Sequence, residues 1–181
     1  MSKLIDKEEL LELFYSNPNR EYHVREVARM TNLAPATASK YLDMFAKDSI
    51  LLKRAERRHA LFKANEESRL FKLKKTGYNV EKLQKSGLID FLEEKLNYPE
   101  AVLLFGSYAK GENIEKSDID LFVLTATKKV PELEKYEKLL KASIQLFLYD
   151  KKSFKEMISK NKELFNNIIN GIKISGFLEV A

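Results

Sequence analysis

The apolar positions in the first 47 residues recur with helical spacing in three separate stretches. Because residues three and four apart share one face of a helix, each stretch predicts an amphipathic helix with one buried face. Proline cannot continue a helix, so Asn17-Pro18-Asn19 ends the first, whereas Pro35 suits the first turn of the third. The buried faces that we expect are Leu10, Leu11 and Phe14 within residues 7–15, Val24, Val27 and Ala28 in the second helix, and Ala38, Tyr41, Leu42 and Phe45 in the third.

A β-hairpin is expected after the three helices. Residues 50–53, which begin with the apolar Ile50, Leu51 and Leu52, predict a short strand. Residues 59–64 place Ala60, Phe62 and Ala64 on one face, which predicts a second strand. The intervening Arg54-Ala55-Glu56-Arg57-Arg58 is polar and basic and is expected at the hairpin tip.

The rest of the chain alternates strands with helices. Residues 66–97 are amphipathic and helical, with breaks expected near Gly77 and Gly87. Strands are expected at 101–105, 118–124 and 143–149, and helices after Pro131 and from about 152 to 170, where Gly171 is a stop signal. We therefore predict an α+β protein with a first domain at 1–66, a helical connector at 67–97 and an α/β domain with a mixed sheet at 98–181.

Composition narrows the class of protein. The sequence has no cysteine, which excludes disulfides and thiolate metal sites and favours a cytoplasmic location. No apolar run is long enough to cross a bilayer, and charges interrupt the first six residues too closely for a signal peptide. We therefore expect no membrane association.

The charge is unevenly distributed. Residues 1–77 contain 16 basic and 11 acidic residues, whereas 78–181 contain 16 of each, so the net charge of +5 resides in the first part. All seven arginines also lie there. Arginine suits phosphates and guanine edges better than lysine does. Composition alone leaves open whether this part binds nucleic acid or whether a lysine-rich chain has clustered its arginines by chance.

The segment from Arg25 to Leu42 resembles winged helix-turn-helix regulators of transcription. It has an alanine in the supporting helix, a short turn, and a helix of small residues that ends on an apolar pair. The resemblance implies DNA binding, with the second helix of the motif in the major groove and the hairpin as a wing. The expected DNA contacts are Thr37, Ser39, Lys40, Arg54, Arg57 and Arg58. A trihelical protein-interaction module is the alternative, and the basic hairpin favours DNA.

Two short motifs in the last third of the chain carry candidate chemistry. Asp118 and Asp120 are two apart on a predicted strand, so both carboxylates point to the same face and can grip one divalent cation. Gly106-Ser107 follows a predicted buried strand and opens a turn whose N–H groups and hydroxyl suit phosphates. A cation site beside a phosphate cradle is the equipment for nucleotidyl transfer.

This block, from Phe105 to Val123, resembles the nucleotidyltransferase superfamily that includes DNA polymerase beta, and especially its minimal archaeal and bacterial members. The resemblance implies that Asp118 and Asp120 are the catalytic, metal-binding residues. It implies that Gly106, Ser107 and Lys110 bind the nucleotide, with Mg²⁺ as the cofactor and a nucleoside triphosphate as the substrate or ligand.

One position departs from that family. Catalytic members carry a third carboxylate on a later strand, and the matching position here is Gln145. A neutral amide takes no proton and is a poor magnesium ligand. Asp150 is the nearest acid, but it is placed to cap the following helix.

Three hypotheses follow, and the sequence does not choose among them. The protein is a nucleotidyltransferase that modifies a protein or small acceptor while bound to DNA, or a nucleotide-sensing transcription regulator with little catalysis, or an antitoxin-like protein. The last rests on resemblance, because some minimal nucleotidyltransferases are antitoxins that modify a HEPN-type toxin. Winged helices often bind DNA as homodimers, and the helical stretch 78–97 is the candidate dimer contact.

Overall fold

The computed structural model describes residues 7–56 and 59–179. The chain divides into two compact units, Met1–Lys75 and Thr76–Ala181. The division falls inside one helix, α4, within the segment that the sequence analysis assigns to a connector. The expected domain boundaries at residues 66 and 97 stay predictions. None of the described helices is long and apolar enough to cross a membrane.

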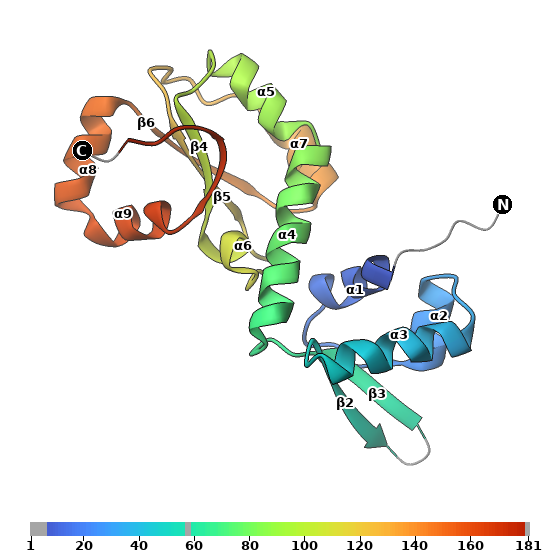
Figure 1. Ribbon diagram of the computed structural model, residues 1–181. Helices are drawn as coiled ribbons and strands as arrows, with labels where there is room; N and C mark the ends of the chain where they lie inside the picture. The colour runs from blue at the N-terminus through green and yellow to red at the C-terminus, as the bar shows by residue number, and fades with distance from the viewer. Residues whose placement is uncertain (1–6, 57–58, 180–181) are drawn as a thin grey trace. The chain divides into compact units, whose positions relative to one another are not determined.

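The first unit combines three helices with a small antiparallel sheet (Figure 1). Strand β3 lies in the middle of this sheet, with β1 on one side and β2 on the other. The elements of this unit are α1 (Lys7–Ser16), β1 (Tyr22–His23), α2 (Val24–Met30), α3 (Pro35–Lys47), β2 (Leu51–Glu56) and β3 (His59–Ala64).

The core of this unit is built from the helix faces that the periodicity predicts. All but two of the expected residues are buried: Leu10, Leu11, Phe14, Val27, Ala28, Ala38, Leu42 and Phe45. Val24 and Tyr41 are partly exposed. The ring of Phe14 meets Tyr22 of β1 edge-on, with 5.0 Å between ring centroids. Helices and sheet therefore share one core.

The hairpin is longer than the sequence predicts. Strand β2 continues to Glu56, so Arg54 lies within a paired strand, opposite Leu61, and not at the tip. The apolar pattern ends at Leu52 because the outer half of β2 is exposed and buries no face. Strand β1 has only two residues, too few to show a period.

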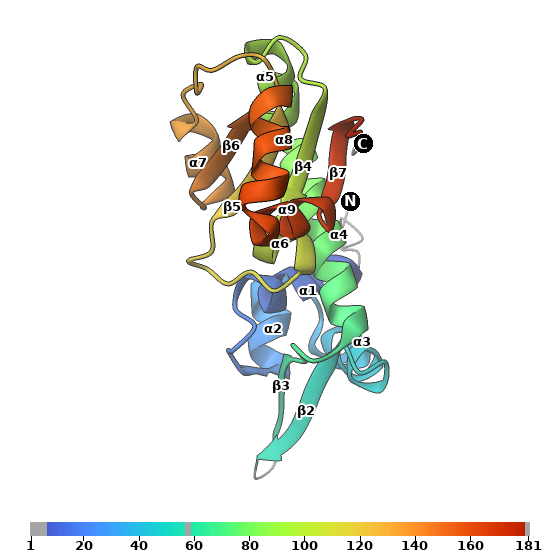
Figure 2. The ribbon, with the colours of Figure 1, turned by 90° about the vertical axis from the view of Figure 1, so that its left-hand side faces the viewer.

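The second unit is a four-stranded mixed sheet covered by helices (Figures 1 and 2). The strand order is β6-β5-β4-β7, in which only the β5–β6 pair is parallel. Helix α4 (Arg69–Lys85) begins before the division between the units. The remaining elements are α5 (Leu88–Lys95), β4 (Ala101–Phe105), α6 (Gly106–Lys110), β5 (Ile119–Leu124), α7 (Glu134–Leu140), β6 (Ile144–Tyr149), α8 (Lys151–Lys160), α9 (Lys162–Ile169) and β7 (Ile172–Gly176).

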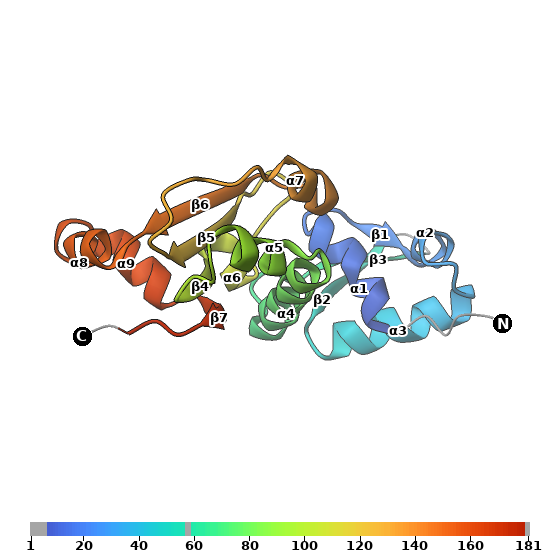
Figure 3. The ribbon, with the colours of Figure 1, turned by 90° about the horizontal axis from the view of Figure 1, so that it is seen from above.

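The central strands β4 and β5 are buried on both faces (Figure 3). Successive side chains of β5 alternate between two cores. Leu121 and Val123 pack with side chains of α4, α5 and α7, whereas Phe122 and Leu124 pack with side chains of α8 and α9. The expected α/β domain with a mixed sheet is thereby confirmed.

Two elements of this unit differ from the prediction. Helix α4 continues through Gly77, where a break was expected, because nothing crowds that position and tertiary packing outweighs the low helix propensity of glycine. Strand β7 follows Gly171 and adds a fourth strand beside β4. Its Ile172 and Ile174 alternate only once and do not form a continuous apolar run like that of β4, so no strand is predicted there.

Candidate functional site

Asp118 and Asp120 lie at the start of the central strand β5. Asp120 is on the strand, flanked in register by Phe105 of β4 and Gln145 of β6. Asp118 comes directly before the strand, and both side chains are partly exposed. The two carboxylates therefore stand together at an open end of the sheet, on the face that carries Phe122.

Gly106 makes room for one of these carboxylates. Its φ angle is +69°, and a Cβ atom at this position would overlap Oδ2 of Asp120. Glycine is thus needed at this position for two reasons: its left-handed backbone conformation and the close approach of the Asp120 carboxylate. The Asp120 carboxylate consequently lies against the turn where β4 ends and α6 begins.

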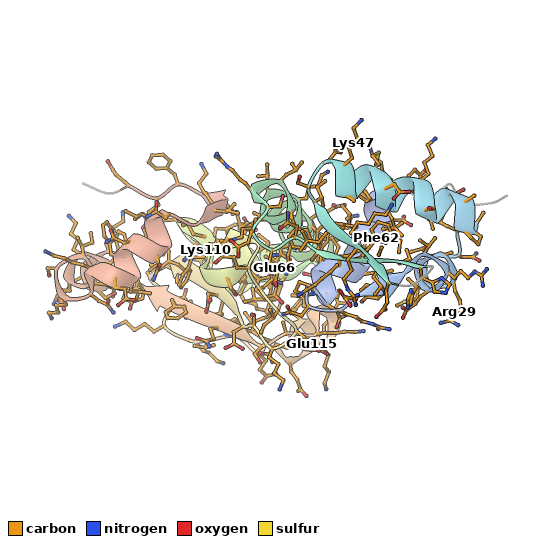
Figure 4. The ribbon with its side chains drawn as sticks, turned by 90° about the horizontal axis from the view of Figure 1, so that it is seen from below. Arg29, Lys47, Phe62, Glu66, Lys110 and Glu115 are labelled. Atoms are coloured by element: carbon orange, nitrogen blue, oxygen red, sulfur yellow. The ribbon has the colours of Figure 1, made fainter. Side chains whose placement is uncertain are left out.

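The remaining nucleotide-binding candidates lie along α6. Ser107 follows Gly106 in the first turn and is partly exposed. Lys110 is exposed at the other end of this five-residue helix, which Gly111 ends with a φ of +67°. Lys110 and Glu115, on the loop that leads to the aspartates, are labelled in Figure 4. The structure therefore brings Gly106 against Asp120 and places Lys110 one helix length away.

Burial and the charge of Asp118 both affect the ionisation of Asp120. Partial burial raises the pKa of Asp120, and the negative charge of Asp118 raises it further. Burial also raises the pKa of Tyr108, and the negative charge of Asp118 raises this pKa as well. A bound cation relieves this repulsion. The two carboxylates at an open end of the sheet therefore fit a Mg²⁺ ion, which prefers one or two carboxylates together with substrate phosphates.

Gln145 stands beside this pair. Its Nε2 donates a hydrogen bond to Oδ2 of Asp118 at 2.6 Å, and its backbone is the register neighbour of Asp120. The described residues contain no cluster of three or more histidine, cysteine, aspartate or glutamate side chains that could hold a metal ion. The expected position for a third acid is therefore occupied by a neutral amide in contact with the site.

Asp150 does not supply the missing carboxylate. It is the N-cap of α8, where its Oδ1 accepts a hydrogen bond from the backbone N–H of Ser153 at 2.7 Å. That bond lowers the pKa of Asp150. The expectation that this residue caps the following helix is confirmed.

A buried asparagine pair that the sequence analysis did not identify holds the loop before Asp118. Asn79 of α4 donates to Oδ1 of Asn113 at 2.8 Å and to the backbone oxygen of Tyr108 at 2.9 Å. Both asparagines are buried. They tie the loop after α6 to α4. Their separation of 34 positions follows no motif, so only the fold reveals them.

The candidate DNA contacts lie on α3 and β2. Thr37 and Ser39 are partly exposed on α3 and Lys40 is exposed. Ser39 also donates a long hydrogen bond of 3.4 Å to Asp43. Arg57 and Arg58 lie outside the described residues.

Arg54 is committed to an ion pair within the first unit. Its guanidinium donates two hydrogen bonds to the carboxylate of Glu21, both at 2.6 Å. These bonds lower the pKa of Glu21 and raise that of Arg54. Because the pair is exposed, it contributes little to stability. A phosphate would have to compete with Glu21 for this side chain.

A hollow of about 760 Å³ opens on the same unit. Two arginines of α2, Arg25 and Arg29, line it together with His23 and His59, whose rings meet edge-on at 5.8 Å. Arg29 is labelled in Figure 4. The sequence shows no relation between the two histidines, because 36 positions separate them and strand pairing alone brings them together.

The comparison with protein families concerns the second unit. Residues 87–176 match the family described as polymerase beta, nucleotidyltransferase. A protein of Methanocaldococcus jannaschii named "Putative protein adenylyltransferase" is 37% identical over 67 residues, which are 36% of this chain and 63% of that protein. The chain thus spans less than two thirds of that relative.

A crystal structure described as "a putative nucleotidyltransferase from Sulfolobus solfataricus" has a TM-score of 0.35 and 13% identity, covering 60% of this chain and 93% of that one. None of these three similarities confirms the winged helix-turn-helix, which stays a prediction.

Replacing Gly106 by alanine tests the close approach to Asp120. We expect Gly106→Ala to lower the free energy of unfolding by about 1–3 kcal/mol, because the residue is forced into a left-handed conformation, and to weaken Mg²⁺ binding by displacing Asp120. Chemical denaturation and calorimetric titration measure the two effects. Gly77→Ala is the control, because it meets no atom within 4 Å and should stabilise α4 slightly. Equal effects of both variants would contradict the proposed contact.

Replacing Asp120 by asparagine tests the cost of burying this carboxylate beside Asp118. A raised pKa in the folded state means that the charged form of Asp120 destabilises the fold at neutral pH. We expect Asp120→Asn to raise the melting temperature at pH 7 without Mg²⁺ and to remove the stabilisation that Mg²⁺ gives the wild type. The gain should disappear as the pH falls below the folded pKa, where Asp120 is itself neutral. A lower melting temperature at pH 7 would show that the repulsion is already compensated.

Proposed function

We propose that the polymerase beta-like nucleotidyltransferase domain in the C-terminal part of this chain transfers a nucleotidyl group from a nucleoside triphosphate to a protein or small acceptor. One observation carries the proposal: Asp118 and Asp120 share a face at the start of β5, with Asp120 against the Gly106-Ser107 turn. The name of the M. jannaschii relative favours an adenylyl group and a protein acceptor.

Each residue of the site has a distinct role in the proposed reaction. Asp118 and Asp120 would hold Mg²⁺, which would supply positive charge to the phosphates of the nucleotide. Ser107 donates its hydroxyl and backbone N–H to those phosphates, and Lys110 contributes its charge from the end of α6. An acceptor oxygen forms a bond to the α-phosphorus as the bond to pyrophosphate breaks. The acceptor proton leaves to solvent or to a group of the acceptor, because the Gln145 amide cannot take it.

A second candidate function rests on that amide. A site with two carboxylates and a neutral third position is equipped to bind a nucleotide but lacks a residue to activate the acceptor. On this alternative the domain senses a nucleotide and has little catalytic activity, either as a regulator or as an antitoxin-like partner of another protein. Nucleotide binding without transfer distinguishes it from the first.

We further propose that the first unit binds DNA as a winged helix-turn-helix. Support comes from three helices followed by a hairpin, from the exposed Lys40 on α3, and from the hollow lined by Arg25 and Arg29. Positively charged side chains that neutralise phosphates displace counterions, which makes the affinity fall with salt. Arg54 would take part only by releasing Glu21.

Transfer is tested with α-labelled ATP, CTP, GTP and UTP in the presence of Mg²⁺ and candidate acceptor proteins. We expect label on an acceptor with the wild type, and at least about a 10³-fold slower reaction with Asp118→Ala/Asp120→Ala, because the charge stabilisation by the metal is lost. Thr127→Ala, a change in the loop after the end of β5 that lies opposite the aspartates, is the control and should retain activity. Nucleotide binding by the wild type with no transfer to any acceptor would favour the sensing alternative.

DNA binding is tested by its salt dependence. We expect the logarithm of the affinity for duplex DNA to fall linearly with the logarithm of the salt concentration, and Lys40→Ala to reduce that slope by about one. Lys47→Ala, at the other end of α3 and labelled in Figure 4, is the matched control and should leave the slope unchanged. An affinity that does not respond to salt would contradict the proposed interface.

A further inference from the structure

The hydrogen bond from Gln145 occupies one oxygen of the metal-binding pair. Its amide N–H points at Oδ2 of Asp118, at a distance of 2.6 Å. The parallel pairing of β5 with β6 sets this contact, because it places Gln145 directly beside Asp120. An amide that donates to a carboxylate directs its positively polarised N–H group at the site. A ligand of a cation would instead direct an oxygen lone pair there.

The negative charge available at the site to bind cations is therefore small. The two aspartates together balance one divalent cation, and the phosphates of a nucleotide complete its ligands. In sites that hold two cations for phosphoryl chemistry, the cations stabilise the attacking and the leaving oxygen. Such sites need further anionic ligands to hold the second cation.

Two of the neighbouring acids are used elsewhere. Asp150 caps α8. Glu137 accepts a hydrogen bond from the backbone N–H of Ile144 at 2.9 Å, which holds the start of β6. No third carboxylate among the described residues joins the pair in a cluster of metal-ligand type.

We infer that this site takes a single divalent cation with its nucleotide, because Gln145 stands beside Asp118 where a third carboxylate would hold a second ion. The inference rests on the proposed function, since it concerns the same cation site. It gives Gln145 a definite part, because its amide N–H holds Asp118 and its lack of a carboxylate leaves no ligand for another cation.

The experiment counts Mn²⁺ ions, used in place of Mg²⁺, on the full chain with the non-transferable analogue α,β-methylene ATP. Electron paramagnetic resonance measures the number of bound ions and shows whether two of them are magnetically coupled. We expect one uncoupled ion on the wild type and two coupled ions on Gln145→Glu, which places a carboxylate of nearly the same shape beside Asp118. Gln84→Glu is the matched control, because it adds the same charge on the exposed side of α4 and should leave one ion.

The outcomes separate this inference from the proposed function. Two coupled ions on the wild type would overturn the inference and leave nucleotidyl transfer intact. One ion on both the wild type and Gln145→Glu would show that Gln145 does not set the number. Binding by the wild type no greater than by Asp118→Ala/Asp120→Ala would remove the cation site itself, and with it both proposals.

A second variant covers the case in which three adjacent carboxylates prevent folding. Gln145→Ala adds no charge, and circular dichroism establishes whether each variant is folded. One ion on a folded Gln145→Ala supports the inference, because a side chain without a carboxylate still leaves a single cation site. Two ions on this variant would contradict it.

Discussion

The contact between the Asp120 carboxylate and the backbone of Gly106 is the constraint on which the candidate site depends. It exists because β4 and β5 pair in a register that sets Asp120 opposite Phe105, the last residue before the turn. The apolar side chains farther along both strands fix that register, since a slip by one residue would exchange the two cores on either side of the sheet. The hydrophobic cores thus position a polar site that contributes nothing to them.

Charge repulsion and packing act in opposite directions at this end of the sheet. Partial burial of the Asp120 carboxylate, and then its closeness to the charge of Asp118 just before the strand, cost free energy, which the raised pKa of Asp120 reports. The surrounding strands tolerate this because the cores of the unit are extensive. Such local costs are common where a protein binds ligands, since a ligand of opposite charge removes them.

The sequence predicts the elements with long or strongly periodic patterns and misses those defined by pairing alone. The three helix faces around Leu11, Val27 and Leu42 follow from spacing, β4 and β5 follow from their apolar residues, and β6 follows from alternation. Strands β1 and β7 are too short to carry a period, and the outer half of β2 is exposed on both faces.

The candidate site is predictable in its residues and less so in its contacts. The spacing of Asp118 and Asp120 indicates a shared face, and the Gly-Ser turn indicates close backbone approach. The hydrogen bond from Gln145, the asparagine pair that ties the loop, and the capture of Arg54 by Glu21 depend on segments brought together from 27, 34 and 33 positions apart. Such contacts depend on tertiary structure, and a single sequence carries no period or motif for them.

The pairing of β7 with β4 has a consequence for how the second unit is made in the cell. Strand β4 is central in the finished sheet, yet its β7 neighbour lies about 70 positions later in the chain. During synthesis, therefore, one side of β4 displays unpaired N–H and C=O groups and apolar side chains until the ribosome has released residues 172–176. Over that interval the nascent chain exposes an unpaired strand edge that can associate with other chains. A chaperone that binds extended apolar segments would bind there.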